Sequence, residues 1–199
     1  MLPPPILLEP DPDQPGAMRP VPGQDEPGRP AAPPRRLNAR FALEHPAHLL
    51  ALGFGAGLSP VAPGTVGTLW AWLSFALARP FFSDAELLLV WLLGFALGWW
   101  ACRVTANHLG INDPGAIVWD EVLAFWLVLW LVTPASFLAQ LTAFALFRFF
   151  DAAKPQPVRW ADRVLKGGGW RGAFGIIWDD LVAAFCTLLV IALWRKLFF

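Results

Sequence analysis

Acidic residues occur as two adjacent pairs, Asp120-Glu121 and Asp179-Asp180, inside stretches that are otherwise apolar. Carboxylates are costly to place in an apolar environment, so paired ones at that depth are candidates for function. Neighbouring residues on a helix point about 100° apart, which lets one member of each pair face the interior of a bundle. Carboxylates from different helices, with water and a phosphate oxygen, would make an octahedral Mg²⁺ site. The alternative interpretation is that both pairs lie near helix N-termini and complement the helix dipole.

A second constellation combines basic and acidic residues in FRFFDAAKPQP, residues 147–157. Arg148, Asp151 and Lys154 are three residues apart and share roughly one helix face, and the following proline would end the helix. An arginine and a lysine beside a carboxylate can hold a phosphate against a metal ion. The plainer alternative is an Arg–Asp surface pair with an anchoring lysine. Asp162, further along, is interpreted as a headgroup contact in an amphipathic connector.

Glycines and prolines interrupt the apolar segment 46–67. Five glycines and two prolines between Leu52 and Gly67 exclude one straight helix. Irregular backbone at membrane depth needs protein or water around its polar groups, which predicts a short half-helix and a loop that lines a polar cavity. Thr65 in this loop is a candidate hydroxyl contact for a phosphate. A second glycine run, 167–169, is either an anion-binding turn before the last helix or a flexible linker.

The elements that must position these residues are predicted from composition. Of the 199 residues, 56% are hydrophobic and 15% are charged, and the mean hydropathy is +0.50, whereas soluble domains are about 25% charged. Apolar runs from residue 41 onward predict an all-α, polytopic membrane helical bundle with a Gly/Pro-rich broken helix near its N-terminal side. Residues 1–40 hold twelve of the twenty prolines and predict a disordered tail, which leaves 41–199 as the membrane-embedded domain. The net charge of zero gives no basic field for nucleic acid.

The apolar runs also predict an orientation. Three helices reach the ~20 residues that cross a bilayer only when acidic residues near one end are included, over 115–133, 135–153 and 176–194. Counting spans then places every acidic cluster on one face of the membrane, together with most of the arginine and lysine residues. The positive-inside rule makes this face cytoplasmic, although Arg195 and Lys196 fall on the other side.

Four stretches together resemble the phosphatidylglycerophosphatase A family, bacterial membrane enzymes that make phosphatidylglycerol from its phosphate precursor. They are HLLALGFGAGLSPVAPGTVGTL (48–69), NDPGAIVWDE (112–121), FRFFDAAKPQPVRWADR (147–163) and GAFGIIWDDLVA (172–183). The resemblance covers residues 45–195 and implies an all-α, Mg²⁺-dependent lipid phosphatase of the bacterial inner membrane. The family usually has His-Gly-Gly shortly before the last acidic motif. Here Lys166 stands in the histidine position, and GWRGAF resembles a short insertion before Ile176.

The residues alone indicate a phosphate or metal site in a membrane, and the resemblance names the substrate. It implies Mg²⁺-dependent hydrolysis of the terminal phosphate of phosphatidylglycerophosphate. Water attack on phosphorus and an aspartyl-phosphate intermediate are both open routes. The catalytic acids expected are Asp120, Glu121, Asp151, Asp179 and Asp180. Within that set, the metal is expected on Glu121, Asp151 and Asp180, and the phosphate on Arg148, Lys154 and Thr65.

Two other functions remain as alternatives, a membrane transporter and a non-catalytic phospholipid-binding protein. A transporter would also place carboxylates and broken helices in a bundle, but its sites usually lie near the midplane of the bilayer. A binding protein would share the basic residues yet would not require clustered acids. The expected partners are a phospholipid substrate and the membrane.

Overall fold

The computed structural model describes residues 8–10, 18–20 and 37–198, and the chain divides into two units between Pro34 and Arg35. In the N-terminal unit, strand β1 (Leu8–Pro10) pairs antiparallel with strand β2 (Met18–Pro20). These two three-residue strands are an exception to the predicted all-α class. Of the predicted disordered tail, residues 1–7, 11–17 and 21–36 lie outside the described residues, whereas its last residues enter helix α1 (Ala39–Glu44).

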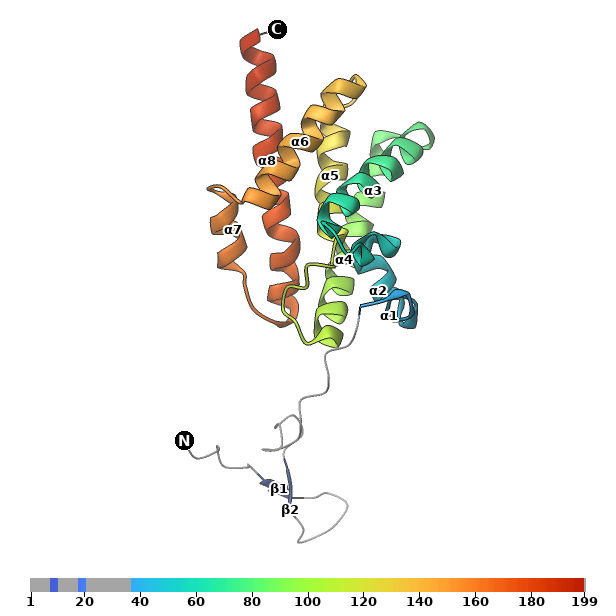
Figure 1. Cartoon of the computed structure of the whole chain (residues 1–199), viewed down its shortest axis with the longest axis vertical. Helices are drawn as coiled ribbons and strands as arrows, with labels where there is room; N and C mark the ends of the chain where they lie inside the picture. The colour runs from blue at the N-terminus through green and yellow to red at the C-terminus, as the bar shows by residue number, and fades with distance from the viewer. Residues whose placement is uncertain (1–7, 11–17, 21–36, 199) are drawn as a thin grey trace. The chain divides into compact units, whose positions relative to one another are not determined.

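The second unit is helical over its described residues, as predicted (Figure 1). Its elements are α1 Ala39–Glu44, α2 Pro46–Ala51, the 3₁₀ helix η1 Gly53–Leu58, α3 Pro63–Ala78, the 3₁₀ helix η2 Arg79–Phe81, α4 Asp84–Leu109, α5 Trp119–Val132, α6 Phe137–Ala153, α7 Val158–Val164 and α8 Gly169–Phe198. Local signals set several boundaries. Ser83 and Glu86 form a capping box at the start of α4, and Gly110 ends that helix in the left-handed conformation (φ 69°).

Helices α5 and α8 pack along each other, α3 covers α5, and α6 and α7 pack against α8 (Figure 1). The core between α5 and α6 contains Phe125 and Phe147, both fully buried, with ring centroids 5.5 Å apart. A second core joins α4 to α2 and α8 through Cys102, Ala47 and Ile177. Burial of each large apolar side chain contributes about 1.5–3 kcal/mol, so these contacts hold α6 against α5 and α8 against α4. The two acidic pairs lie on α5 and α8.

The broken helix predicted near the N-terminal side is present. Helix α2 ends at Ala51, and η1 contains non-helical residues at Phe54 (φ 56°) and Gly55 (φ 106°). The segment packs on the chain before α5, where the Val118 N–H donates to the Ala51 carbonyl at 2.9 Å. The hollow beside η1 is lined by apolar side chains and glycine, whereas Gly64 of the same segment lies against the polar side chains of Glu121 and Arg148.

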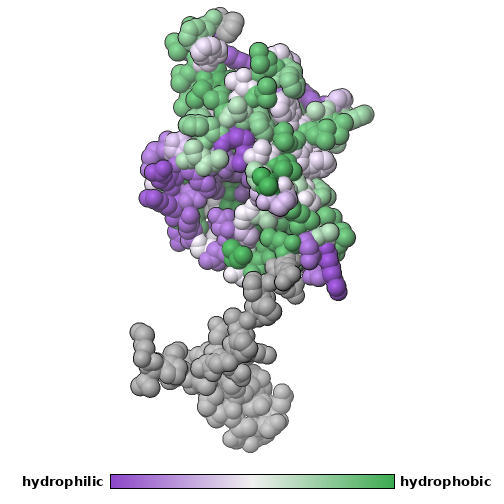
Figure 2. Space-filling model, in the orientation of Figure 1, coloured by the Kyte–Doolittle hydropathy of each residue, from purple (hydrophilic) through white to green (hydrophobic). Residues whose placement is uncertain are grey.

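Helices α4 and α8, with 26 and 30 residues, are long and apolar enough to cross a membrane. Their exposed faces carry large apolar side chains, including Leu92 and Leu97 on α4 and Phe185 and Leu193 on α8. Such a surface is typical of contact with lipid or a partner. Figure 2 shows apolar residues over much of the visible face, with polar residues gathered over α7.

The spanning ranges expected for the other helices differ from the structure. Helices α3, α5 and α6 have 16, 14 and 17 residues, fewer than the ~20 needed to cross a bilayer. Residues 111–118 are not helical, so α5 begins at Trp119 rather than near 115. In contrast, α8 begins at Gly169, well before the expected residue 176, because the glycine-rich segment continues into the helix.

Candidate active site

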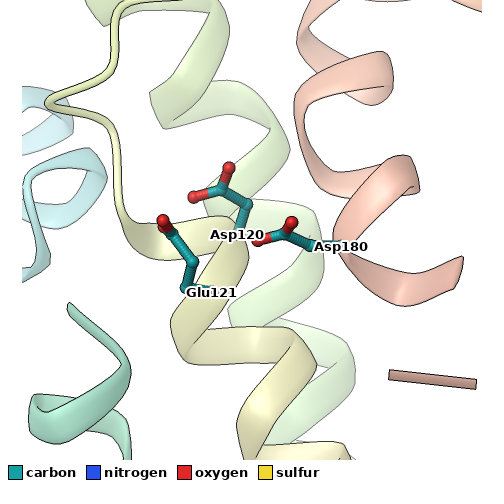
Figure 3. Close-up of side chains that lie close together, drawn as sticks. All are labelled: Asp120, Glu121 and Asp180. Atoms are coloured by element: carbon teal, nitrogen blue, oxygen red, sulfur yellow. The ribbon is translucent and has the colours of Figure 1, made fainter. Parts of the chain in front are cut away.

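Three carboxylates converge between the first turn of α5 and the middle of α8 (Figure 3). Asp120, Glu121 and Asp180 each place one oxygen within 4.8 Å of the others, and they are called the carboxylate cluster below. One oxygen of each, Asp120 Oδ1, Glu121 Oε2 and Asp180 Oδ2, is buried without a hydrogen-bond partner among the described residues. Buried charges of one sign are strongly unfavourable unless they are paired or coordinate a metal.

The donor set fits a hard divalent cation, because Mg²⁺ binds carboxylate oxygens in octahedral geometry and keeps several waters. The expected metal ligands were Glu121, Asp151 and Asp180, and the structure brings two of them, Glu121 and Asp180, together with Asp120. Asp120 completes the cluster, whereas Asp151 forms an ion pair with Arg148. The reason is local: Asp151 lies three residues after Arg148 on α6, so the guanidinium takes the nearest carboxylate.

Arg148 connects α6 to the carboxylate cluster. Its Nη1 lies 3.7 Å from Glu121 Oε1 in addition to its contact with Asp151. Asp151 also lies close enough to Asp180 for their charges to repel. The arginine therefore neutralises part of a strongly acidic region and keeps its remaining N–H groups for an anionic ligand.

Gly64, near the start of α3, closes this region and was missed by the sequence reasoning. A Cβ at this position would clash with Glu121 Oε1 and lie 3.1 Å from Arg148 Nη1. The one available signal was its place in the interrupted segment, directly before Thr65. Thr65 itself is half-buried, and its hydroxyl makes no hydrogen bond to a site residue in the described part of the chain.

Lys154 organises a second set of charges, called the lysine network below. It caps the C-terminus of α6, and its Nζ donates to Asp179 at 2.5 Å and to Asp162 at 2.8 Å. Lys166 donates to the other oxygen of Asp162 at 2.9 Å. Asp162, expected to contact a lipid headgroup, instead bridges two lysines. Neither contact was predicted from the sequence: Lys166 is four residues after Asp162, and Lys154 carried no signal for this pairing.

The ionisation of the lysine network follows from these contacts. Burial raises the pKa of Asp162, but hydrogen bonds from Lys154 and Lys166 outweigh it and hold the pKa below its ordinary value. Burial lowers the pKa of Lys154, and its hydrogen bonds to Asp162 and Asp179 outweigh this and raise the pKa above its ordinary value. Both groups are therefore charged at neutral pH.

Adjacent residues of α8 thus enter different sets, with Asp180 in the carboxylate cluster and Asp179 in the lysine network. Because α8 begins at Gly169, this pair lies well beyond the first turn, where the field of the helix dipole has fallen off. The helix-dipole interpretation consequently fails for Asp179 and Asp180. It remains applicable to Asp120 and Glu121, which occupy the first turn of α5.

An all-helical unit that gathers carboxylates beside an arginine and a lysine has the residue types with which proteins bind phosphate groups and divalent cations. The family model described as Phosphatidylglycerophosphatase A matches residues 49–195. The chain belongs to this family.

Curated relatives agree with that membership. The chain is 40% identical over 145 residues to Phosphatidylglycerophosphatase A of Escherichia coli strain K12, covering 73% of this chain and 81% of that protein. It is 40% identical over 152 residues to Phosphatidylglycerophosphatase A of Haemophilus influenzae, covering 76% and 90%. A putative phosphatidylinositol-3-phosphatase of Bacteroides thetaiotaomicron is 36% identical over 155 residues, covering 74% and 92%. No solved structure matches the chain.

Proposed function

We propose that this chain hydrolyses phosphatidylglycerophosphate to phosphatidylglycerol and inorganic phosphate at the site between α5, α6 and α8. The observation that carries the proposal is the carboxylate cluster, whose three unpartnered buried oxygens lie beside Arg148. Family membership and the printed names of the 40% identical relatives support the substrate. The overall reaction adds water across the terminal P–O bond, with hydroxyl going to phosphorus and the proton to the glycerol oxygen.

Some residues of the site supply charge to the phosphate, and others hold those charged groups in position. Arg148 and Lys154 offer N–H groups to the phosphate oxygens, and such charge-assisted hydrogen bonds are the strong ones. Asp151 and Asp179 orient these two cations through their ion pairs. Mg²⁺ held by Asp120, Glu121 and Asp180 would neutralise charge on the phosphate and lower the pKa of a bound water. Gly64 leaves the space that brings Glu121 and Arg148 together.

We also propose a multi-pass arrangement in the bacterial inner membrane with the site facing the cytoplasm. The exposed apolar faces of α4 and α8 support contact with lipid, and the shorter α3, α5 and α6 would complete the bundle around them. Lys166 of the lysine network is exposed, and so are the arginines at 159, 163 and 171 in the same part of the chain. Loops rich in these residues remain cytoplasmic by the positive-inside rule.

The activity is tested with protein purified in detergent and phosphatidylglycerophosphate in mixed micelles. Inorganic phosphate is measured in Mg²⁺, after EDTA, and after excess Mg²⁺ is returned. The proposal predicts release in Mg²⁺, loss in EDTA and recovery on return of the metal. Absence of release from protein that retains its helical circular dichroism would contradict the proposed activity, and release that persists in EDTA would contradict the metal requirement.

A further inference from the structure

A polar hollow of about 150 Å³ lies beside the lysine network, between the chain that precedes α5 and the connection from α7 to α8. Its polar lining comes from Asn112 and Asp113 on one side and from Asp162, Lys166 and Asp179 on the other. This hollow is called the headgroup pocket below. Neither the family description nor the names of the relatives assign it a role.

The polar groups of the headgroup pocket differ in how they are satisfied. Asp162 and Asp179 both pair with Lys154, so their carboxylates are already satisfied and fixed in position. Asn112 and Asp113 are exposed, and within the described residues neither side chain makes a hydrogen bond or ion pair. The Lys166 side chain is 60% exposed while it contacts Asp162. An amide, a carboxylate and part of an ammonium group are therefore available to a ligand.

Close backbone packing builds the opposite wall of the pocket. A Cβ at Gly172 would clash with the Gly167 carbonyl, and one at Gly175 would lie 2.7 Å from the Leu165 carbonyl oxygen. A Cβ at Gly168 would lie 3.3 Å from Asn112 Oδ1, which places this amide against the glycine run. The glycines thus bring the α7–α8 connection onto α8 and hold Lys166 opposite Asn112.

The pocket adjoins the proposed phosphate site through shared residues. Asp179 lines the pocket, receives a hydrogen bond from Lys154, and is the neighbour of Asp180 in the carboxylate cluster. A substrate whose terminal phosphate contacts Arg148 and Lys154 would place its next polar atoms near this lining. The volume is well below the roughly 300–1,000 Å³ of pockets that enclose whole drug-sized ligands. It suits a three-carbon polyol fragment and excludes a diacylglycerol.

We propose that the headgroup pocket binds the glycerol unit and the phosphodiester that lie between the terminal phosphate and the lipid. The inference rests on the proposed function and adds the source of its specificity. Asn112 and Asp113 contact the free glycerol hydroxyl, and Lys166 pairs with the phosphodiester charge. The site therefore prefers phosphatidylglycerophosphate to phosphatidic acid, a phosphomonoester lipid in which this unit is absent.

The test compares kcat/KM for phosphatidylglycerophosphate and for phosphatidic acid, each at the same surface concentration in mixed micelles. Removal of a hydrogen bond to a charged group costs about 1.5–3 kcal/mol, so the ratio of the two values is expected to fall about tenfold or more in Lys166→Ala and several-fold in Asn112→Ala. Lys166→Arg keeps the cation and is expected to restore most of the ratio. Arg159→Ala removes an exposed cation that does not line the pocket and is expected to leave the ratio unchanged.

Three results would overturn the inference. An unchanged ratio in both Lys166→Ala and Asn112→Ala would show that the pocket does not contact the distinguishing part of the substrate. An equal loss on both lipids would show that these residues act on folding or on the phosphate itself. Wild-type protein that hydrolyses neither lipid would overturn the proposed function, and this outcome is distinct because it precedes any comparison of variants.

Discussion

The carboxylate cluster and the lysine network contain neighbouring residues of α8, yet their charges are satisfied in opposite ways. In the cluster, Asp180 meets two further acids and retains a buried oxygen without a partner in the described residues. In the network, Asp179 receives a hydrogen bond from Lys154 at 2.5 Å. One helix therefore carries two carboxylates, one left in need of a cation and one already neutralised.

This difference separates carboxylates that could bind a metal ion from carboxylates that position a lysine. Unpaired buried carboxylates destabilise the protein alone and are stabilised when a cation binds. Paired carboxylates contribute in the absence of any ligand and fix the cation that they hold. We infer that the cluster is built for a metal ion, whereas the network places Lys154 and shapes the headgroup pocket. Substitutions in the carboxylate cluster and in the lysine network should consequently differ in how much they change phosphate release and how much they change the unfolding temperature.

The largest expected effect comes from Asp180→Asn, which breaks the carboxylate cluster. Phosphate release should fall at least about 100-fold, the loss typical for a group that stabilises charge in the transition state. Without metal, the variant should unfold at the same or a higher temperature than wild type, since one of three mutually repelling charges is removed. Phosphate assays and thermal unfolding in EDTA measure the two effects.

Asp84→Asn is the matched control for that experiment. Asp84 is exposed at the start of α4, where it pairs with Arg79, and its loss should leave phosphate release near the wild-type rate. An Asp180→Asn variant that retains activity, or that is strongly destabilised in EDTA, would remove the distinction between the two sides of α8.

Gly64→Ala should disturb the cluster without removing a charge. The added methyl group would clash with Glu121 Oε1 and crowd Arg148, and displacement of groups that orient a metal site typically costs about 10–100-fold in activity or metal affinity. Phosphate release at saturating Mg²⁺ measures the loss. Gly115→Ala is the control, because a Cβ there has no neighbour within 4 Å. Equal rates in both variants would argue against a close approach of α3 to the site.

Lys154→Ala tests the lysine network. It leaves Asp162 and Asp179 without their shared donor, and an unsatisfied buried polar group costs about 1–3 kcal/mol. The variant should unfold at a lower temperature than wild type in EDTA, in contrast to Asp180→Asn. A second substitution, Asp179→Asn, should cost less in the Lys154→Ala background than in wild type, as expected for interacting residues. Lys196→Ala, in an exposed position near the end of α8, should leave the unfolding temperature unchanged.

The smallest effect is the acid sensitivity of the network. Since the pKa of Asp162 is lower in the folded protein than its unfolded value of about 3.9, its ionised form stabilises the fold above that value. This contribution is lost as the pH falls through the folded pKa. The difference in unfolding temperature between wild type and Asp162→Asn should therefore be constant from about pH 5 to 7 and shrink below about pH 4. A difference that grows on acidification would contradict the lysine pairing.

Much of the helical fold could be predicted from composition and local signals. Long apolar runs indicated helices, the segment 46–67 indicated a break, and the proline after Lys154 indicated the end of α6. Boundaries set by tertiary contacts were less accessible. The glycine run at 167–169 is typical of a linker, but α8 begins within it at Gly169, and Gly175 of that helix packs closely on the Leu165 carbonyl.

The candidate site was predicted in its residue types more than in its pairings. Adjacent acids on a helix must diverge by about 100°, so the sequence indicated that Asp179 and Asp180 face different partners. It gave no means to decide which partner each meets, because that depends on the rotation of α8 against α5 and α6. The pairing of Asp162 with Lys154 and the position of Gly64 against Glu121 were missed for a related reason, since both depend on contacts between different elements.

The most direct measurement is calorimetric titration of Mg²⁺ into metal-free protein in detergent, with wild type, Asp180→Asn and Asp179→Asn compared under the same conditions. The carboxylate cluster predicts that wild type binds Mg²⁺, that Asp179→Asn binds within a few-fold of wild type, and that Asp180→Asn loses at least about 100-fold in affinity, or about 2.7 kcal/mol. Equal losses in the two variants, or unchanged binding in Asp180→Asn, would contradict the assignment of the metal to the carboxylate cluster.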